Sequence, residues 1–247
     1  MDIFEEYYKS LNGVGILNYR NMQESGEEHF IRANMTKLQS PVIFDVGANS
    51  GIYSKTLLEF CPSASIFAFE PHPINFKNLT DNGDPRIRAF NIGAGAVDEV
   101  AEFYDYQNED GSEHASLYKG VIEDIHQRPS VCHRVPIRRL DGVAAELGVS
   151  RIHFLKIDTE GHELEVLRGA EGLIRSNAVD IIQFEFNETN VVSRVFFKDF
   201  WDFLPNYKFH RLLPKGALHI SQYSATFCEV FAYQNYVCVR KDSSIFG

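Results

Sequence analysis

The chain has 247 residues, of which 44% are hydrophobic and 23% are charged, and its formal net charge at pH 7 is −10. This length and composition are typical of one soluble globular domain with a substantial core. The chain has 34 acidic and 24 basic residues and no block of Lys or Arg. This balance disfavours a nucleic-acid partner and binding to an anionic membrane surface.

No apolar run reaches about 18 residues, and the N-terminus lacks the pattern of a signal peptide. We therefore expect a cytoplasmic protein with no integral membrane segment. The cysteines lie far apart, without a Cys-x-x-Cys pair or zinc spacing, and are expected to be free thiols. They are Cys61, Cys132, Cys228 and Cys238.

The N-terminal residues 1–40 predict a helical extension that precedes the main domain, residues 41–247. A short helix is expected over 3–11. A second helical face places Ile31, Met35 and Leu38 at i, i+4 and i+7, and it ends before Pro41.

From residue 41 the chain alternates apolar strands with amphipathic helices. We expect strands over 41–47, 64–71, 86–93, 151–158 and 179–188, with helices over 50–61, 73–83, 161–176 and 195–205. Strands this apolar are buried on both faces, so the pattern predicts a doubly wound α/β fold with a mostly parallel sheet. Two later strands, over 207–213 and 229–241, predict an antiparallel addition at one edge.

Residues 98–137 interrupt this alternation. The stretches VAEFYDYQ and CHRVPIRRL predict a β-pair, and the polar segment 108–130 between them is long enough to be an active-site loop or lid. Cofactor cover or acceptor contacts are expected from four side chains in this segment. These are His114, Ser116, Tyr118 and Lys119.

In open α/β sheets, ligands bind at the carboxyl ends of the strands. The first strand leads into a G-x-N-x-G turn formed by Gly47, Asn49 and Gly51, which lacks the G-x-G-x-x-G pattern that holds a pyrophosphate. N–H groups at this turn and at the following helix start favour a carboxylate, and Asp45 is placed to pair with an ammonium group. These features predict a site for the amino-acid end of S-adenosylmethionine.

The second strand ends at Glu70, 19 residues after Gly51. A carboxylate at this position can accept both hydrogen bonds from a ribose diol. Asn91 and the Gly-rich stretch after it are expected beside the adenine, or else form a structural turn into the β-pair. The predicted cofactor-binding residues are Asp45, Gly47, Ala48, Asn49, Ser50, Gly51, Glu70, Pro71, Asn91, Ile92, Gly93 and Ser116.

Four stretches, VIFDVGANSGIY, FAFEPHP, VPIRRLD and HFLKIDTEGHELEVLRGAEGLI, resemble in order and spacing the FkbM family of S-adenosylmethionine-dependent methyltransferases. The resemblance covers about residues 40 to 190. It implies the three-layer, Rossmann-like class I methyltransferase fold, with a seven-stranded, mostly parallel sheet whose last strand is antiparallel. It also implies O-methylation of a hydroxyl on a sugar, glycolipid or natural product, with S-adenosyl-L-homocysteine as the second product.

An alcohol acceptor benefits from a general base. Asp158, at the end of the fourth main strand, is the first candidate, and His162 is the alternative that titrates near neutral pH. Lys156 and Glu185 complete the predicted catalytic group, either by touching substrate or by pairing with each other. Asp158, His162 and Glu185 also have the chemistry of an oxygen–nitrogen metal site, but no ligand spacing requires one and we predict no metal.

The helix that follows carries Glu160, Glu163 and Glu165 near its start, where they are expected to complement the positive end of the helix. The partner is expected to be a small-molecule or carbohydrate acceptor, and the oligomeric state stays open. Two other functions share the sheet: a nicotinamide-dependent oxidoreductase, which would also use Glu70, and a non-catalytic cofactor-binding protein. The turn and the absence of a Tyr-x-x-x-Lys pair disfavour the first.

Overall fold

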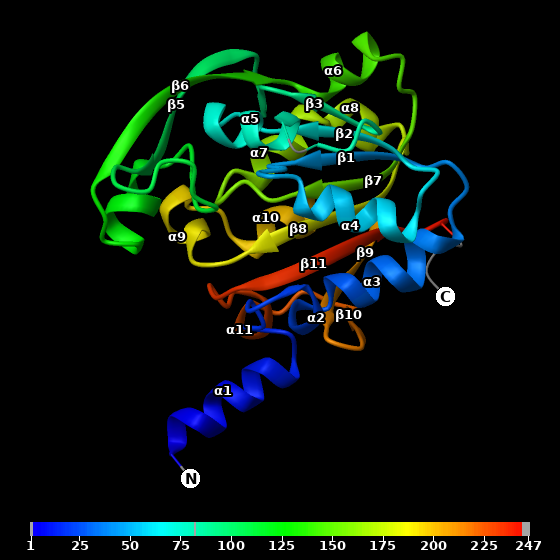
Figure 1. Ribbon diagram of the computed structural model, residues 1–247. Helices are drawn as coiled ribbons and strands as arrows, with labels where there is room; N and C mark the ends of the chain where they lie inside the picture. Colours follow the sequence, from blue (N-terminus) through cyan, green and yellow to red (C-terminus); the bar gives the residue numbers. More distant parts are fainter. Residues whose placement is uncertain (1, 82, 244–247) are drawn as a thin grey trace.

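An eight-stranded mixed sheet forms the centre of the protein in the computed structural model, which describes residues 2–81 and 83–243 (Figure 1). Its strands are β1 (Val42–Val46), β2 (Ser65–Phe69), β3 (Ile87–Phe90), β7 (Ile152–Ile157), β8 (Val179–Phe186), β9 (Tyr207–Leu213), β10 (Gly216–Ile220) and β11 (Gln234–Arg240). Their order across the sheet is β10-β9-β11-β8-β7-β1-β2-β3.

Strands β3, β2, β1, β7 and β8 run parallel, whereas β11 is antiparallel to both β8 and β9. The predicted α/β class I methyltransferase fold, with a parallel core and an antiparallel last strand, is confirmed. The structure adds an eighth strand, β10, which pairs antiparallel with β9 at the sheet edge. The last strand, β11, lies inside the C-terminal addition rather than at its edge.

Helices cover both faces of the sheet. The helices are α1 (Ile3–Gly13), α2 (Met22–Ser25), α3 (Glu27–Asn34), α4 (Ile52–Phe60), α5 (Pro73–Asp81), α6 (Leu140–Glu146), α7 (Glu163–Gly169), α8 (Glu171–Arg175), α9 (Thr189–Ser193), α10 (Phe197–Phe203) and α11 (Ala225–Cys228), with a 3-10 turn at Met35–Lys37. The helix expected over 161–176 is divided at Ala170 into α7 and α8.

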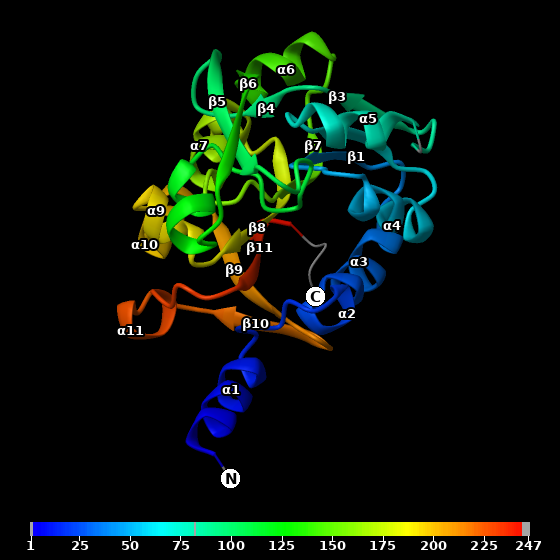
Figure 2. The same ribbon diagram turned by 60° about the vertical axis from the view of Figure 1, so that its left-hand side comes forward.

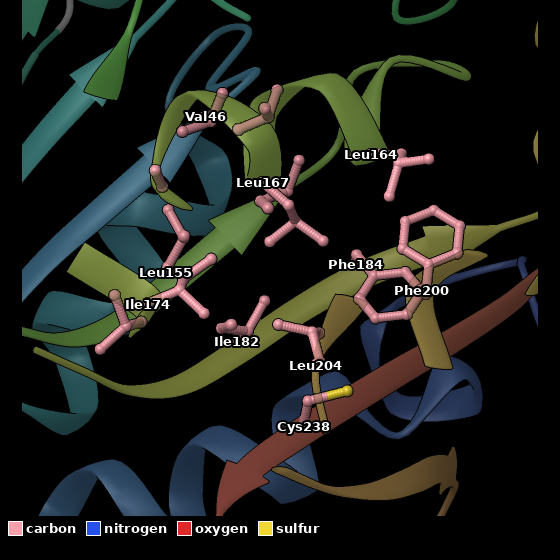
Figure 3. Close-up of a cluster of buried hydrophobic side chains, with 14 of the residues drawn as sticks. Val46, Leu155, Leu164, Leu167, Ile174, Ile182, Phe184, Phe200, Leu204 and Cys238 are labelled. Atoms are coloured by element: carbon pink, nitrogen blue, oxygen red, sulfur yellow. The ribbon is translucent and has the colours of Figure 1, made fainter. Parts of the chain in front are cut away.

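Successive residues of each strand point to opposite faces of the sheet. They therefore pack in two separate hydrophobic cores, one on each face. In β1, Phe44 packs in a core with residues of α6, α7, α8 and α10, whereas Ile43 packs in a core with residues of α3, α4 and α5. Figure 3 shows part of the first core, where Phe184 of β8 stacks on Phe200 of α10 at 4.4 Å between ring centroids. These two cores make the three layers of the fold.

A second, three-stranded sheet extends from the main one, in the order β4-β6-β5. It consists of β4 (Gly93–Ala94), β5 (Glu99–Tyr106) and β6 (Ser130–Arg138), and the antiparallel pairing of β5 with β6 confirms the predicted β-pair. The polar segment between them contains a π-helical turn at Val121–Ile125 and bridges to β5 through Ser116 and Tyr104. We call residues 93–138, which contain this sheet and the polar segment, the arm. Figure 2 shows the arm beside the carboxyl ends of the parallel strands.

The N-terminal segment has two parts that behave differently. Phe30 and Ile31 of α3 are buried against the sheet, so α3 is part of the packed domain. Helix α1 projects away from the sheet, and none of its residues Ile3–Gly13 is buried (Figures 1 and 2). Within the described part of the chain no helix has the length and apolar character that a membrane crossing needs. All four cysteines are free thiols.

Candidate functional site

A cavity of about 270 Å³ opens where the parallel strands β1, β2, β7 and β8 end. This is the place where the fold predicts a ligand. The β1–α4 turn, the Glu70–Pro71 corner, the arm, the β7–α7 turn and Glu185 all contribute to its lining, and the N-terminal segment adds Met22 and Glu27.

The β1–α4 turn is fixed by close backbone packing. Gly47 has φ +77°, and a Cβ atom there would lie 1.7 Å from the carbonyl oxygen of Asp158. Only glycine fits this approach, which presses the turn against the end of β7. Asn49 adopts φ +47° and donates its backbone N–H to Glu70 Oε2 at 2.7 Å.

The N–H groups of residues 47–51 all have partners within the protein. Those of Gly47 and Ala48 donate to the Phe69 carbonyl, and the others bond to Glu70, Asn49 Oδ1 and the Ala48 carbonyl. The expectation that these N–H groups cradle a carboxylate is therefore corrected. The first turn of α4 remains as the positive end that faces the cavity, because Ile52 and Tyr53 line it and the first N–H groups of a helix lack helical partners.

Glu70 lies at the predicted place and lines the cavity. Its Oε1 accepts the His72 N–H and its Oε2 accepts the Asn49 N–H, both at 2.7 Å. Burial raises the pKa of Glu70 to about 7, although these two backbone donors oppose the shift. Each carboxylate oxygen keeps a lone pair free, so the group is fixed in position and still able to accept from a diol.

Several predicted cofactor residues lie outside the lining. Asn91 Nδ2 donates to the carbonyls of Glu70 and Pro71, at 2.9 and 3.0 Å, and these hydrogen bonds stabilise the backbone conformation at Glu70–Pro71. Ser116 is fully buried and donates to the Glu160 carbonyl at 2.7 Å. Ile92 packs against the first core, and Gly51 is the left-handed residue before α4. We correct these four from ligand contacts to supports, whereas Gly47, Ala48, Asn49, Ser50, Glu70, Pro71 and Gly93 line the cavity.

Asp45 also differs from expectation. It is fully buried and does not line the cavity; its Oδ2 accepts from Ser54 Oγ at 2.6 Å, and its Oδ1 lies 3.7 Å from Lys156 Nζ. The expected contact with a ligand ammonium group is therefore corrected. Asp45 instead holds a lysine that itself faces the cavity.

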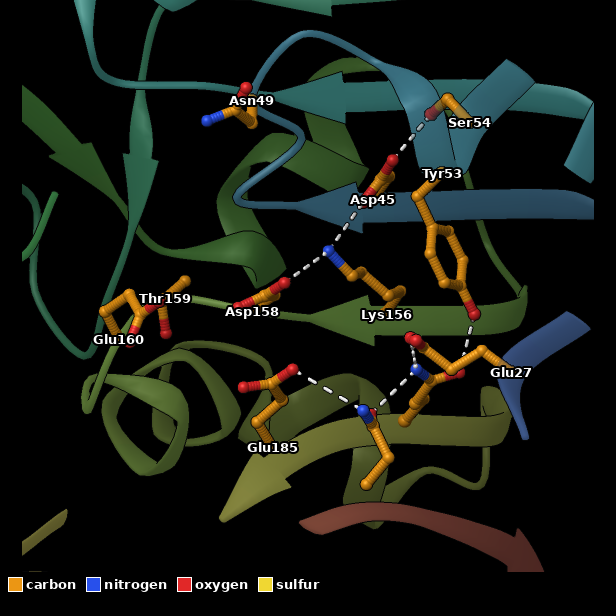
Figure 4. A network of polar contacts seen from close by, with 12 residues as sticks. Glu27, Asp45, Asn49, Tyr53, Ser54, Lys156, Asp158, Thr159, Glu160 and Glu185 are labelled. Carbon is orange, nitrogen blue, oxygen red and sulfur yellow. Dashed lines mark hydrogen bonds and ion pairs between the residues drawn. The ribbon is translucent and has the colours of Figure 1, made fainter. Parts of the chain in front are cut away.

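Lys156 joins Asp45 to Asp158, whose Oδ2 it approaches at 3.1 Å (Figure 4). It also lies 5.0 Å from the ring centroid of Tyr53. Burial lowers the pKa of Lys156, but the nearby carboxylates Asp158, Asp45 and Glu27 outweigh it and the pKa is raised. The lysine is a fixed cation whose charge is already shared between two acids.

A chain of buried amides lies opposite this ion pair. Gln183 accepts from Tyr53 Oη at 2.6 Å and donates to Glu27 Oε1 at 2.8 Å and Asn235 Oδ1 at 3.0 Å (Figure 4). Asn235 in turn donates to Glu185 Oε1 at 3.4 Å. Glu27 and Tyr53, which the sequence analysis did not select, thus share one network with the predicted Glu185.

Glu185 has amide partners but no cationic hydrogen-bond partner among the residues described. Besides Asn235, the described residues bring only the Asn187 amide within hydrogen-bond distance of Glu185, at 3.2 Å. Burial raises the pKa of Glu185 well above its usual value, and the charges of Asp158, Glu160 and Glu27 raise it further. Proton affinity is therefore higher at Glu185 than at a solvated glutamate.

His162 lines the cavity but does not titrate near neutral pH. Burial lowers the pKa of His162 to about 4. Its Nδ1 lies 3.1 Å from Tyr118 Oη, and a Cβ atom on Gly95 would approach its Nε2 to 3.0 Å. His162 therefore belongs to the arm side of the cavity, in its neutral form.

The acids of the β7–α7 turn have separate roles. Glu163 is buried, and its Oε1 accepts from the Thr159 N–H, the Thr159 hydroxyl and the Gly161 N–H. These hydrogen bonds stabilise the β7–α7 turn. Glu160 has φ +50° and faces the cavity, with His114 Nδ1 3.4 Å from its Oε1. The expectation that these two acids only complement the helix end is corrected.

The arm side of the cavity is apolar. Phe103 and Ile137 of the arm and Leu117 of the polar segment line it beside Pro71 and Ala94. A flat, uncharged ring such as adenine fits such a surface. The sequence analysis missed these residues because single apolar residues on a β-pair give no signal of their own.

His72, Asp110 and His133 form a cluster whose ligand-type atoms lie within 4.8 Å of one another. Asp110 Oδ1 lies 2.9 Å from His72 Nε2 and 2.8 Å from His133 Nε2. His72 Nδ1 accepts the Ile74 N–H at 3.2 Å, so the ring proton resides on Nε2. A metal-bound imidazole normally donates from its second nitrogen. The cluster therefore has the geometry of a hydrogen-bonded clasp, which ties the polar segment to the corner that holds Glu70.

Comparisons with known proteins add the family. Residues 45–211 match the methyltransferase FkbM domain. The AMB antimetabolite synthetase AmbE of Pseudomonas aeruginosa is 29% identical over 178 residues, which are 59% of this chain and 8% of that protein.

Two shorter relatives are similar as well. The 2-O-methyltransferase NoeI of Sinorhizobium fredii is 26% identical over 187 residues, 71% of this chain and 76% of that protein. The hexuronic acid methyltransferase AglP of Haloferax volcanii is 31% identical over 155 residues, 61% of this chain and 59% of that protein. The chain thus spans a small part of AmbE and a little over half of AglP.

The family match covers more than half of the chain and includes the cofactor turn, the arm and the β7–α7 turn. It gives no support to the nicotinamide-dependent alternative. The chain belongs to the FkbM family, and its residues 45–211 form an S-adenosylmethionine-dependent methyltransferase domain.

Proposed function

We propose that this enzyme methylates a hydroxyl oxygen of a neutral, polyhydroxylated acceptor, such as a sugar, a glycan or a natural product. The observation that carries the proposal is the character of the cavity wall between Asp158 and Glu185. The half-buried carboxylates Glu27 and Glu185, on neutral amide or hydroxyl partners, form this wall, and its one lysine is already paired.

The residues present fit S-adenosylmethionine. Glu70 is fixed to accept from the ribose diol, and the apolar arm side suits adenine. The first turn of α4 faces the cavity with its positive end, which suits the carboxylate of the methionine part. Asp158, whose side chain is 34% exposed, replaces Asp45 as our candidate partner for the ammonium group.

The cofactor supplies an activated methyl group, so the protein mainly has to align the acceptor and remove its proton. We assign proton removal to Glu185 in preference to Asp158. Lys156 Nζ already lies 3.1 Å from Asp158 Oδ2, whereas Glu185 lacks a cationic partner in the described structure. Burial raises the pKa of Glu185 well above its usual value, and a carboxylate with a raised pKa binds an abstracted proton more strongly.

The charge of the lining favours a neutral acceptor over an anionic one. Among the described residues, six acids and one lysine line the cavity. The acids are Glu27, Glu70, Glu113, Asp158, Glu160 and Glu185. An anionic acceptor would lack a free cationic partner in the described lining and would face several like charges at low local dielectric.

The names of the relatives support oxygen as the methylated atom. NoeI is named a 2-O-methyltransferase, and AglP a hexuronic acid methyltransferase. We carry over the hydroxyl acceptor and, because of the acidic lining, expect this chain to differ from AglP in the charge of its substrate.

The test is transfer of labelled methyl from S-adenosylmethionine into metabolite and glycan extracts separated into neutral, cationic and anionic fractions. We expect label in neutral products, as an ether that resists mild base. Label only in anionic products would contradict the charge argument, and label on nitrogen or carbon would contradict hydroxyl transfer.

A further inference from the structure

The segment 14–27, which connects α1 to α3, contacts the carboxyl end of β9 through two glycines. Gly15 has φ +81° and Gly26 has φ +88°. A Cβ atom on Gly15 would lie 2.3 Å from the Leu212 carbonyl oxygen, and one on Gly26 would lie 2.2 Å from the Leu213 carbonyl oxygen. Only glycine fits both positions. The backbone of the segment is therefore packed directly on β9, and Figures 1 and 2 show its helix α2 beside the β9–β10 hairpin.

Arg211 of β9 binds the start of the same segment. Its side chain is fully buried, and its Nη1 donates to the Val14 carbonyl at 3.1 Å. Its Nε and Nη2 donate to Tyr236 Oη at 3.1 and 2.8 Å, and Nη2 also donates to the Phe227 carbonyl at 3.3 Å. A buried cation needs such hydrogen bonds, because leaving its N–H groups without partners is unfavourable. The guanidinium group is therefore fixed, and it fixes the Val14 carbonyl in turn.

The other end of the segment forms part of the acceptor side of the cavity. Met22 and Glu27 line the cavity, and Glu27 begins α3 directly after Gly26. Glu27 Oε2 accepts from Ser25 Oγ at 2.7 Å, and its Oε1 accepts from Gln183 Nε2 of β8 at 2.8 Å. The contact of Gly26 with β9 therefore determines where Glu27 lies relative to β8.

The cofactor turn is remote from these contacts in the sheet. It follows β1, and the strands β11, β8 and β7 lie between β9 and β1. Gly26 and Arg211 are also outside the cavity lining. A shift of the segment on β9 would therefore reach the acceptor side directly, through Met22 and Glu27, and the cofactor turn only through three intervening strands.

We propose that Gly26 and Arg211 are positioning residues for the acceptor, which act by fixing the segment 14–27 on β9. The inference rests on the proposed function, because it takes Glu27 as part of the acceptor side of the cavity. Neither residue touches the acceptor. Gly26 sets the start of α3, and Arg211 holds the start of the segment. Disturbing either contact should weaken acceptor binding and leave cofactor binding nearly unchanged.

The test is Gly26→Ala, with Gly148→Ala in the α6–β7 loop as the matched control. Both glycines have left-handed φ values, +88° and +69°, but a Cβ atom on Gly148 meets nothing within 4 Å. Both variants thus carry similar backbone strain, and only Gly26→Ala pushes against β9. The acceptor probe is the extract fraction that the parent enzyme labels from S-adenosylmethionine.

The expected result is a change in the acceptor KM alone. The amount of the fraction that gives half the maximal rate should rise about tenfold in Gly26→Ala, because small misplacements of positioning groups have effects of this size. The maximal rate and the S-adenosylhomocysteine affinity should stay within about twofold of the parent values. Gly148→Ala should keep all three quantities.

Tyr236→Phe is a milder second variant, since it keeps the ring and removes only the hydroxyl that accepts from Arg211. Its control is Tyr207→Phe, because Tyr207 is also buried and its Oη donates to the Val179 carbonyl at 2.7 Å. Each variant loses a buried hydroxyl. Only Tyr236→Phe should raise the half-saturating amount of the fraction, by about threefold.

A combination of Gly26→Ala with Glu27→Gln separates positioning from a general structural role. If Gly26 acts through Glu27, the double variant should raise the half-saturating amount by less than the product of the two single effects. A purely structural role would give independent effects, whose product the double variant would reach.

Hydrogen exchange of the ligand-free protein follows the segment without any acceptor. Gly26→Ala should speed exchange over residues 16–34, and Gly148→Ala should not. Unchanged exchange in this range, an unchanged half-saturating amount, or an equal loss of S-adenosylhomocysteine affinity would each overturn the proposal. Label outside the neutral fraction would instead contradict the proposed function, and the variants would then be compared on the fraction that is labelled.

Discussion

The two halves of the cavity are built in different ways. In the cofactor half, short backbone segments hold one another: the β1–α4 turn packs on Asp158, and backbone N–H groups fix Glu70. In the acceptor half, side chains from distant parts of the chain meet, with Glu27 and Glu185 joined through buried amides. Backbone contacts leave little freedom for substitutions in the cofactor half. In the acceptor half, single side chains can be substituted without altering the backbone.

This difference suggests a division of tasks. A half made of backbone contacts suits a ligand that every family member shares. A half made of long-range side-chain contacts suits a ligand that differs between members. Each of the following changes tests whether cofactor and acceptor functions separate along this line.

The largest effect is expected from Glu185→Gln. If Glu185 removes the acceptor proton, kcat should fall about 10²–10⁴-fold, with S-adenosylhomocysteine affinity nearly unchanged. Asp158→Asn should instead weaken S-adenosylhomocysteine binding measured by calorimetry. A larger loss of kcat in Asp158→Asn than in Glu185→Gln would return the base to Asp158, and Glu113→Gln at the exposed rim is the control.

The next effect is expected from Gly47→Ala. The positive φ alone costs roughly 1–3 kcal/mol, and the new Cβ would meet the Asp158 carbonyl oxygen at 1.7 Å. We expect a loss of S-adenosylhomocysteine affinity of about 100-fold, since each 1.4 kcal/mol is tenfold. The control is Gly142→Ala, because a Cβ at Gly142 meets nothing within 4 Å. Unchanged affinity in Gly47→Ala would contradict the close approach of the turn to β7.

A smaller effect is expected from pH. The pKa of Glu70 is raised by burial to about 7, and a ribose diol needs the charged form as its acceptor. S-adenosylhomocysteine affinity should therefore increase about tenfold from pH 6 to pH 8. The stability of the ligand-free protein changes in the opposite direction. Because the folded-state pKa lies above the ordinary glutamate value of 4.5, the stability that Glu70 contributes at low pH is lost as the pH rises through about 7.

Glu70→Gln should flatten this pH dependence of binding. Glu163→Gln should preserve it, although the pKa of Glu163 is also raised by burial to about 7, because Glu163 lies behind the turn and does not line the cavity. Equal flattening in both variants would mean that the dependence comes from the fold rather than from the ribose contact.

The smallest effect is expected from Glu27→Gln. The substitution keeps an acceptor oxygen but replaces a charged acceptor by a neutral one, a difference of about 1 kcal/mol, so the acceptor KM should rise roughly fivefold while cofactor affinity stays constant. Glu28→Gln is the control, since Glu28 pairs with Arg32 and lies outside the cavity lining. A change in cofactor affinity for Glu27→Gln would mean that the two halves are not separate.

Local patterns predicted several residues of the cavity lining. Gly47, Asn49 and Glu70 lie in short stretches whose turn chemistry depends on neighbours in sequence, and the structure places all three at the cavity. Asp45, one of five predicted cofactor residues that lie outside the lining, shows the limit. Its partner is Lys156, which lies beside it only because β1 and β7 pair in the register Asp45↔Lys156, and a sequence alone does not state that register.

The acceptor half was less predictable for the same reason. Glu185 and Asn235 are neighbours through the antiparallel register of β8 with β11, across 50 residues of chain. Glu27 reaches Gln183 across 156 residues. Helical periodicity located α3, but it gave no reason to select an acid on its first turn.

The position of Glu27 has a consequence for the diversification of such enzymes. The family match begins at residue 45, so the segment that brings Glu27 and Met22 to the cavity lies upstream of the shared region. Replacing that segment alone would exchange part of the acceptor wall and leave the cofactor turn, Glu70 and the catalytic strand ends untouched. New substrate ranges could then arise by recombination at a single boundary, near Pro41, without any change in the methyl-donating machinery.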